Sequence, residues 1–194
     1  MLEAAVALLF VLGCLGATDI VFYHSLSHGI RSHAESRFEL WIHSLRGPIY
    51  ATMFLVLPNF AFAGGWVVAV YALLVLDVAV TVIDFSLEGA SREKLGGLPS
   101  GEYVLHMLIG MTFGAFAATT VASTYSRLLA STAIRYQPCV GMMPQLVLAG
   151  MAALVFYSGI LDAAAARRLG AAKAGHEKMS FSRPAVTKGV IGSG

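Results

Sequence analysis

Two short patterns in the chain each pair a carboxylate with an imidazole four residues later. These pairs are Glu39 with His43 and Glu102 with His106. Residues four apart lie on one face of a helix, so each pair can direct both side chains at a common point. An aspartate precedes each pair, with Asp19 lying 20 residues before the first glutamate and Asp84 lying 18 before the second. Carboxylates and neutral imidazoles together suit iron, manganese or zinc, so the recurrence predicts a metal site.

The predicted site gathers these residues with a few polar neighbours. Seven residues are the expected metal ligands: Asp19, His24, Glu39, His43, Asp84, Glu102 and His106. Five more are expected to support the ligands: Tyr23, Asp77, Glu88, Arg46 and Arg92. Soluble four-helix di-iron proteins gather glutamates and a Glu-x-x-His motif from facing helices, which is the same logic with a different spacing. Two metals could activate oxygen against a lipophilic substrate, and one zinc could instead activate water for hydrolysis.

A purely structural reading of the same residues stays open. Glu39 lies three residues after Ser36, which is the spacing of a capping box, and Glu102 sits favourably near a helix N-terminus. Ser100 is the expected N-cap of that second helix. The buried acids could also form an ion-pair network with nearby arginines. His28 and His33 fall in a hydrophilic loop and are expected to be solvated.

Haem b is a lesser alternative. His43 and His106 are expected at matching depths on different helices, and two such imidazoles can be the axial ligands of a haem. Gly47 follows the first by one turn and Gly110 follows the second, which leaves room for a ring. The several carboxylates are left unexplained by haem.

The elements that must position these residues are membrane helices. Of 194 residues, 57% are hydrophobic and 12% are charged, whereas soluble domains carry about 25% charged residues. The mean hydropathy is +0.74. Five segments approach the roughly 20 apolar residues that cross a bilayer: 3–24, 40–59, 65–87, 101–123 and 144–164. The sequence predicts an all-α integral membrane helical bundle with five transmembrane helices, and a turn at 58–66 between the second and third.

The distribution of basic residues gives an orientation. Most arginines and lysines fall between the first and second segments, between the third and fourth, or after the fifth, and Arg127 and Arg135 fall on the opposite side. The positive-inside rule then places the N-terminus outside and the C-terminus in the cytoplasm. The first segment lacks a basic leader and is expected to be retained. We expect one membrane domain, 1–169, and a flexible cytoplasmic tail, 170–194.

The chain shows no P-loop, dinucleotide fingerprint or Gly-x-Ser-x-Gly elbow. Nothing in it indicates nucleic-acid binding. The expected partners are the lipid bilayer and other membrane subunits, because Gly110-x3-Gly114 can pack closely against another helix. Cys14 and Cys139 are expected at different depths and therefore unpaired.

Three stretches of the chain resemble a family of bacterial multi-span inner-membrane proteins. They are His43–Arg46 continuing through Ile49–Ala51, then Val80–Phe85, then Leu98-Pro99 with Glu102 and His106. The family has no established activity, so the resemblance implies a location in the bacterial inner membrane and no catalytic role.

Two functions follow as hypotheses. The first is a carboxylate–histidine metal-site protein, specifically a non-haem metal oxidoreductase acting on a lipophilic substrate. The alternative is a non-catalytic accessory subunit of a larger respiratory or photosynthetic complex, which a 20.5 kDa chain with little mass outside the membrane would fit.

Overall fold

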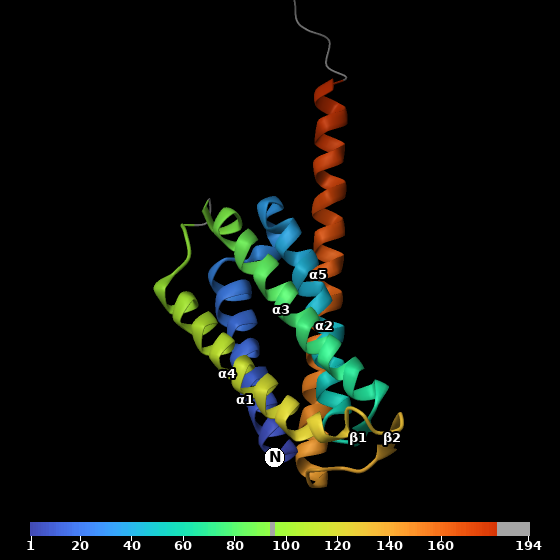
Figure 1. Ribbon diagram of the computed structural model, residues 1–194. Helices are drawn as coiled ribbons and strands as arrows, with labels where there is room; N and C mark the ends of the chain where they lie inside the picture. Colours follow the sequence, from blue (N-terminus) through green and yellow to red (C-terminus); the bar gives the residue numbers. More distant parts are fainter. Residues whose placement is uncertain (94–95, 182–194) are drawn as a thin grey trace, which may run out of the picture.

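The computed structural model describes residues 1–93 and 96–181, and it describes their side chains except at 90, 92 and 173–181. The described residues form five long α-helices that run alternately in opposite directions (Figure 1). Their bounds are α1 Leu2–Thr18, α2 Arg37–Val56, α3 Gly65–Arg92, α4 Ser100–Thr124 and α5 Met142–Phe181. The helical fold class is therefore confirmed.

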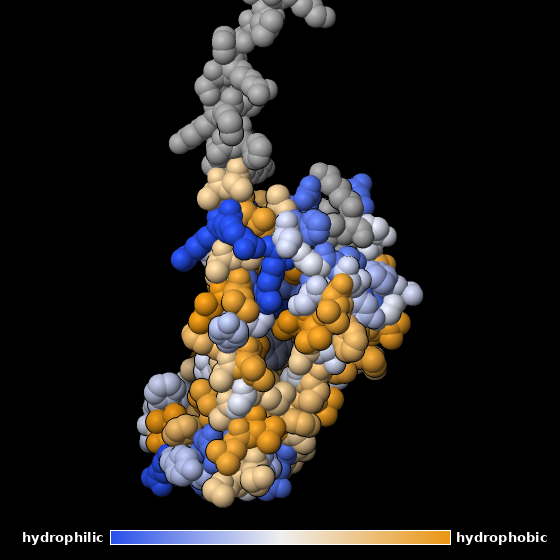
Figure 2. Space-filling model, turned by 180° about the vertical axis from the view of Figure 1, so that it is seen from behind, coloured by the Kyte–Doolittle hydropathy of each residue, from blue (hydrophilic) through white to orange (hydrophobic). Residues whose placement is uncertain are grey.

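Four of the helical stretches are long and apolar enough to cross a membrane. They are Leu2–Ser27, Gly65–Gly89, Ser100–Arg127 and Met142–Ala172. The second expected segment, 40–59, lies mostly in helix α2, and α2 does not reach that hydropathy among the described residues because it carries Arg37, Glu39 and Arg46. Figure 2 shows apolar residues over most of one face, with hydrophilic residues gathered mainly toward one end. This distribution is typical of helices surrounded by lipid.

A two-stranded antiparallel sheet closes one end of the bundle. Strand β1, Phe60–Ala63, pairs with β2, Ala133–Tyr136, so that Phe60 lies opposite Tyr136. The expected turn at 58–66 is incomplete as a description, because four of the nine residues, 60–63, are extended and hydrogen-bonded to a strand far along the chain. The sheet lies at the same end of the molecule as the N-terminus (Figure 1).

Helix α2 crosses α5 at two glycines. A Cβ on Gly47 would lie 3.2 Å from the Gly159 Cα and 3.1 Å from the backbone oxygen of Val155. Glycine thus allows the two backbones to approach closely, as in other small-residue helix contacts. This crossing accounts for Gly47 without a haem ring. By contrast, a Cβ on Gly110 or Gly114 would meet nothing within 4 Å among the described residues, so that glycine pair does not pack within the chain.

Helix α5 continues past the boundary expected at 169. It remains helical to Phe181 and projects beyond the other helices at the end opposite the N-terminus (Figure 1). The remainder of the expected tail, 182–194, lies outside the described residues.

The two expected helix caps are not formed. Ser36 precedes α2 but its side chain makes no capping hydrogen bond. Ser100 is the first residue of α4, and Pro99 occupies the N-cap position. A capping box therefore does not explain Glu39. Both glutamates lie in the first turn of their helices, so the expected favourable position of Glu102 near a helix N-terminus is confirmed.

Candidate metal centre

The first two candidate ligands lie on a π-helical segment. Helix α1 passes directly into η1, Asp19–Ser27, whose hydrogen bonds span five residues. In an α-helix, residues five apart point about 140° away from each other. The wider π turn instead places Asp19 and His24 on one face, where Oδ2 of the aspartate lies 3.3 Å from Nε2 of the histidine. The Ser25 hydroxyl donates a hydrogen bond to the Ile20 carbonyl five residues earlier and supports this turn.

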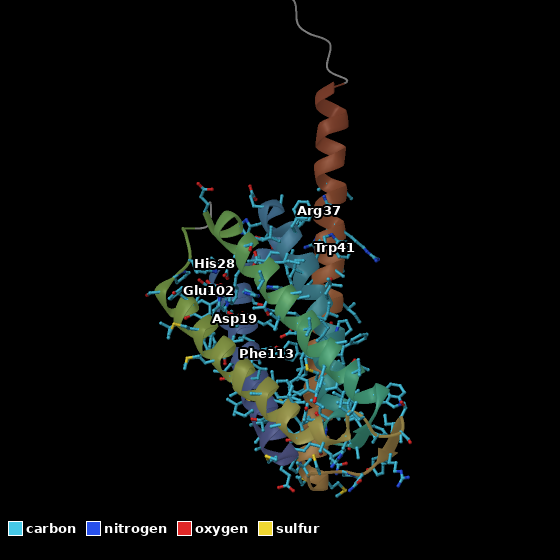
Figure 3. The ribbon with its side chains drawn as sticks, viewed as in Figure 1. Asp19, His28, Arg37, Trp41, Glu102 and Phe113 are labelled. Carbon is cyan, nitrogen blue, oxygen red and sulfur yellow. The ribbon has the colours of Figure 1, made fainter. Side chains whose placement is uncertain are left out.

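The other two ligands come from the first turns of α4, which packs alongside α1. Glu102 and His106 are four apart and both face η1. His106 Nε2 lies 3.3 Å from Asp19 Oδ1, and His24 Nε2 lies 4.0 Å from Glu102 Oε1. Figure 3 shows Asp19 and Glu102 together with His28 between these helices, away from Phe113 further along α4. The predicted convergence of the second Glu-x3-His pair with the first aspartate is thus present.

These four side chains could hold one metal ion. Each offers one ligand atom, all four atoms lie within 4.8 Å of one another, and all four residues are buried. Ligands about 2.0–2.2 Å from a tetrahedral metal lie about 3.4 Å from one another. The two 3.3 Å separations above are similar, but they involve different oxygens of Asp19, so only one of them joins two ligand atoms when this carboxylate binds through one oxygen. The carboxylate oxygen Asp19 Oδ1 is buried and accepts no hydrogen bond from the described residues. A cation among these atoms would satisfy it.

Three further residues contact the ligands from outside the group. Glu88 Oε2 lies 3.3 Å from His106 Nδ1, the ring nitrogen that faces away from Asp19. This is the arrangement in which a carboxylate orients a metal-binding imidazole and fixes its tautomer. Phe85 stacks on the same imidazole, with ring centroids 5.2 Å apart. His28 Nδ1 lies 3.6 Å from Glu102 Oε2, and His28 is only 7% exposed, so the expectation that it is solvated is wrong.

The first Glu-x3-His pair forms a separate group. Glu39, His43 and His24 each offer an atom within 4.8 Å of the others. However, the rings of His24 and His43 are stacked, with centroids 4.5 Å apart and planes inclined by 13°. The lone pairs of an imidazole lie in the plane of its ring, so two stacked rings place them in separate, nearly parallel planes. Convergence on one metal is therefore poorer here than between His24 and His106.

His43 is instead held by an ion-pair network with α3. His43 Nε2 lies 3.1 Å from Asp84 Oδ1, and Arg46 Nη1 donates a hydrogen bond of 3.1 Å to Asp84 Oδ2. Deeper in the bundle, the Tyr50 hydroxyl donates to Asp77 Oδ2 at 3.0 Å. The expected support by Arg46 and Asp77 is thus directed at Asp84 and at α2, not at the four-residue group. Arg92, the remaining expected support, has a side chain outside the described residues.

Glu39 is buried against α3 as well. The Ser91 hydroxyl donates a hydrogen bond to Glu39, and Ser91 Oγ also lies 2.8 Å from Ser36 Oγ. Glu39 is only 2% exposed. The sequence does not predict Ser91 as the partner of Glu39, because a serine in the last turn of a long apolar helix gives no signal.

An apolar hollow of about 480 Å³ lies on the outer side of the four-residue group. Its walls include the chain neighbour of every ligand in the group: Thr18, Tyr23, Gly101 and Leu105. The Tyr23 ring packs on Gly101, where a Cβ would collide with the tyrosine hydroxyl. Tyr23 therefore lines the hollow, and it is not one of the four residues whose ligand atoms converge.

One buried acid on α5, Asp162, is not among the site residues expected from the sequence. Asp162 is buried, and its Oδ1 accepts a 2.6 Å hydrogen bond from Arg31 Nε in the segment between η1 and α2. Arg31 Nη2 donates to the Ser158 hydroxyl as well. A single acid in an otherwise apolar helix was the available signal. This contact ties the segment that carries His28 to α5.

The chain matches no protein-family model, no curated protein and no solved structure.

Proposed function

We propose that this protein is a multi-pass metalloprotein of the bacterial inner membrane. It binds one iron or manganese ion through Asp19, His24, Glu102 and His106, and it acts as a non-haem oxidoreductase on a lipophilic substrate. The single observation that carries the proposal is the convergence of four buried ligand atoms within 4.8 Å, from two helices that are long and apolar enough to span a membrane.

The ligand set favours iron or manganese over zinc for catalysis. Two imidazoles and two carboxylates complete a four-coordinate zinc site, whereas a catalytic zinc keeps one position open. Iron(II) and manganese(II) accept more than four ligands, so the same residues leave positions for oxygen and substrate. A stoichiometric zinc ion would therefore indicate a structural site.

The lipophilic substrate is supported by the hollow beside the ligands. Its apolar walls belong to the helical stretches Leu2–Ser27 and Ser100–Arg127, both of membrane length, so a substrate would enter from the bilayer.

The membrane arrangement we propose keeps five spans with the N-terminus outside. Helix α2 runs antiparallel to its neighbours, and Arg46 and Tyr50 turn toward Asp84 and Asp77 of α3. These contacts pair Arg46 and Tyr50 with acids inside the bundle, as is usual for polar groups in membrane helices. The resemblance to bacterial inner-membrane proteins supports the location.

Metal analysis of the purified full-length protein tests the proposal. Wild type should contain about one iron or manganese per chain, with no Soret band. His106→Ala and Glu102→Gln should each lose the metal. His33→Ala is the matched control, since His33 comes from the segment before α2 and belongs to neither metal-binding group.

Two other outcomes would replace the proposal. A metal-free and haem-free protein that co-purifies with a larger respiratory or photosynthetic complex would support the accessory role. A Soret band lost in His43→Ala and His106→Ala would instead support haem b.

A further inference from the structure

Three arginines gather where the first turns of α2 meet α5. Arg37 lies on α2, and Arg167 and Arg168 lie on α5. Among the described residues, none of the three forms an ion pair. The nearby Arg31 differs, because Asp162 neutralises it. The group therefore carries uncompensated positive charge, separate from the metal ligands.

The two helices are in register at this place. The Arg37 guanidinium packs on Gly170, where a Cβ would lie 2.7 Å from Cζ. One turn along each helix, the Arg167 guanidinium lies over the Trp41 ring, 5.8 Å from its centroid. Gly170 thus makes room for one guanidinium while Trp41 positions the next. Figure 3 shows Arg37 and Trp41 together beside α5.

The remaining arginine is fixed from the other side. Arg168 Nη2 donates a 3.0 Å hydrogen bond to the backbone oxygen of Arg31. Arg37 Nε is buried and has no hydrogen-bond acceptor among the described residues. An acceptor of high negative charge would therefore complete both the charge and the hydrogen bonding of this group.

The surroundings indicate a membrane interface. Phe38, which is 66% exposed, lies beside the Arg37 guanidinium, 5.7 Å from ring centroid to Cζ. Figure 2 shows strongly hydrophilic residues gathered at one end of the molecule, directly beside the apolar surface. Exposed aromatics and arginines at the edge of a bilayer contact lipid headgroups, and guanidinium groups bind phosphate through paired hydrogen bonds.

We infer that Arg37, Arg167 and Arg168, with Trp41, form a binding site for the phosphate of an anionic membrane lipid. The lipid phosphate lies between α2 and α5, and its acyl chains follow the apolar surface below. Basic groups between membrane helices on the cytoplasmic side are suited to such headgroups. This site is independent of the metal centre.

Quenching of tryptophan fluorescence in vesicles tests the inference. The chain has two tryptophans, Trp41 near the start of α2 and Trp66 near the start of α3, and these two helix starts lie at opposite ends of the bundle. In the full-length Trp66→Phe protein, only Trp41 reports. Phosphatidylglycerol with brominated acyl chains should quench it more strongly than brominated phosphatidylcholine at equal mole fraction. Arg37→Gln and Arg168→Gln, which leave the contact of Arg167 with Trp41 in place, should each lower the relative affinity for the anionic lipid by roughly fivefold. Gly170→Ala should do the same by displacing Arg37.

Two matched controls accompany these variants. In Trp41→Phe, Trp66 should show no preference between the lipids, and Arg127→Gln with Arg135→Gln should leave the Trp41 preference unchanged. Equal quenching of Trp41 by both lipids in the Trp66→Phe protein would overturn the inference. A preference abolished by inorganic phosphate in the buffer would indicate a site for the free anion and would also contradict it.

Discussion

Asp19 and His24 lie five residues apart in the chain, and their Oδ2 and Nε2 atoms lie 3.3 Å apart because the helix between them is π-helical. This relationship creates the candidate metal centre. An α-helix through the same residues would direct the two side chains about 140° apart. The local widening of the helix is thus the feature on which ligand convergence depends.

Adding one residue to the π-helical segment should abolish metal binding. An alanine inserted after Val21, which is half exposed on η1, places Asp19 and His24 six residues apart, a spacing that neither an α-helical nor a π-helical turn brings to one face. We expect loss of bound metal with helix content retained, measured by metal analysis and circular dichroism. Val21→Ala is the control and should bind metal as wild type does. An insertion variant with full metal content would show that the spacing of Asp19 and His24 is dispensable.

Glu88→Gln should weaken metal binding without abolishing it. The carboxylate orients the His106 imidazole through Nδ1 and does not belong to the four-residue group. Loss of such an orienting group lowers metal affinity by about 10–100-fold. Competition with a chelator of known affinity measures the change in metal affinity. The control is Glu93→Gln, because Glu93 is exposed and directly follows α3. Equal affinities in the two variants would refute the orienting role.

Replacing Arg46 should reduce stability more than metal binding. Arg46 is the cation that faces Asp84 and Asp77 in the bundle interior. Removing one partner of a buried ion pair is expected to cost about 3–5 kcal/mol. Arg46→Met should therefore lower the free energy of unfolding, measured by denaturation in mixed micelles. The folded fraction should still contain about one metal ion per chain. A parallel loss of metal would instead indicate that His43, Asp84 and Arg46 contribute to the metal centre.

The α2–α5 crossing should not tolerate a side chain. Gly159→Val inserts a β-branched group where a Cβ already meets the Ser44 backbone oxygen at 3.1 Å. Overpacking of this kind costs about 1–3 kcal/mol. Gly150→Val on the same helix is the matched control, since its Cβ would meet nothing within 4 Å. Thermal denaturation of both variants checks the difference, and equal stability would argue against a close crossing.

Cys139 should report the orientation of the protein. It lies in the segment between α4 and α5, whereas Cys14 lies within α1. Partial burial raises the pKa of the Cys139 thiol above its usual value, so less reactive thiolate is present at a given pH. An impermeant maleimide added outside intact cells should label the protein slowly, with the half-maximal rate at a higher pH than for a solvated thiol.

Cys139→Ser should abolish this labelling and Cys14→Ser should leave it unchanged. Labelling that requires permeabilised cells would reverse the proposed orientation.

Much of the helical framework could be predicted from apolar segment length. The segments 65–87 and 101–123 correspond closely to α3 and α4, because long apolar runs have few alternatives to a helix. The end of α5 could not be placed, because the sequence after 164 remains compatible with a helix although it is no longer apolar. The pairing of β1 with β2 depends on a contact between segments about 70 residues apart, for which the sequence has no local signal.

The candidate centre was predicted in part. The expected ligands Asp19, His24, Glu102 and His106 converge, because two helices of similar depth pack side by side. Asp84 and His43 were assigned to the same centre, and they instead satisfy each other and Arg46. Residue type and spacing cannot separate a ligand from an ion-pair partner, since both need buried charge.

The most direct test of the central claim is X-ray absorption spectroscopy of the metal-loaded protein. The four-ligand centre predicts two imidazoles on one ion in wild type, one imidazole in His106→Ala rebound with excess metal, and two in His43→Ala. Two imidazoles retained in His106→Ala, or one lost in His43→Ala, would contradict the assignment of Asp19, His24, Glu102 and His106 as the metal ligands.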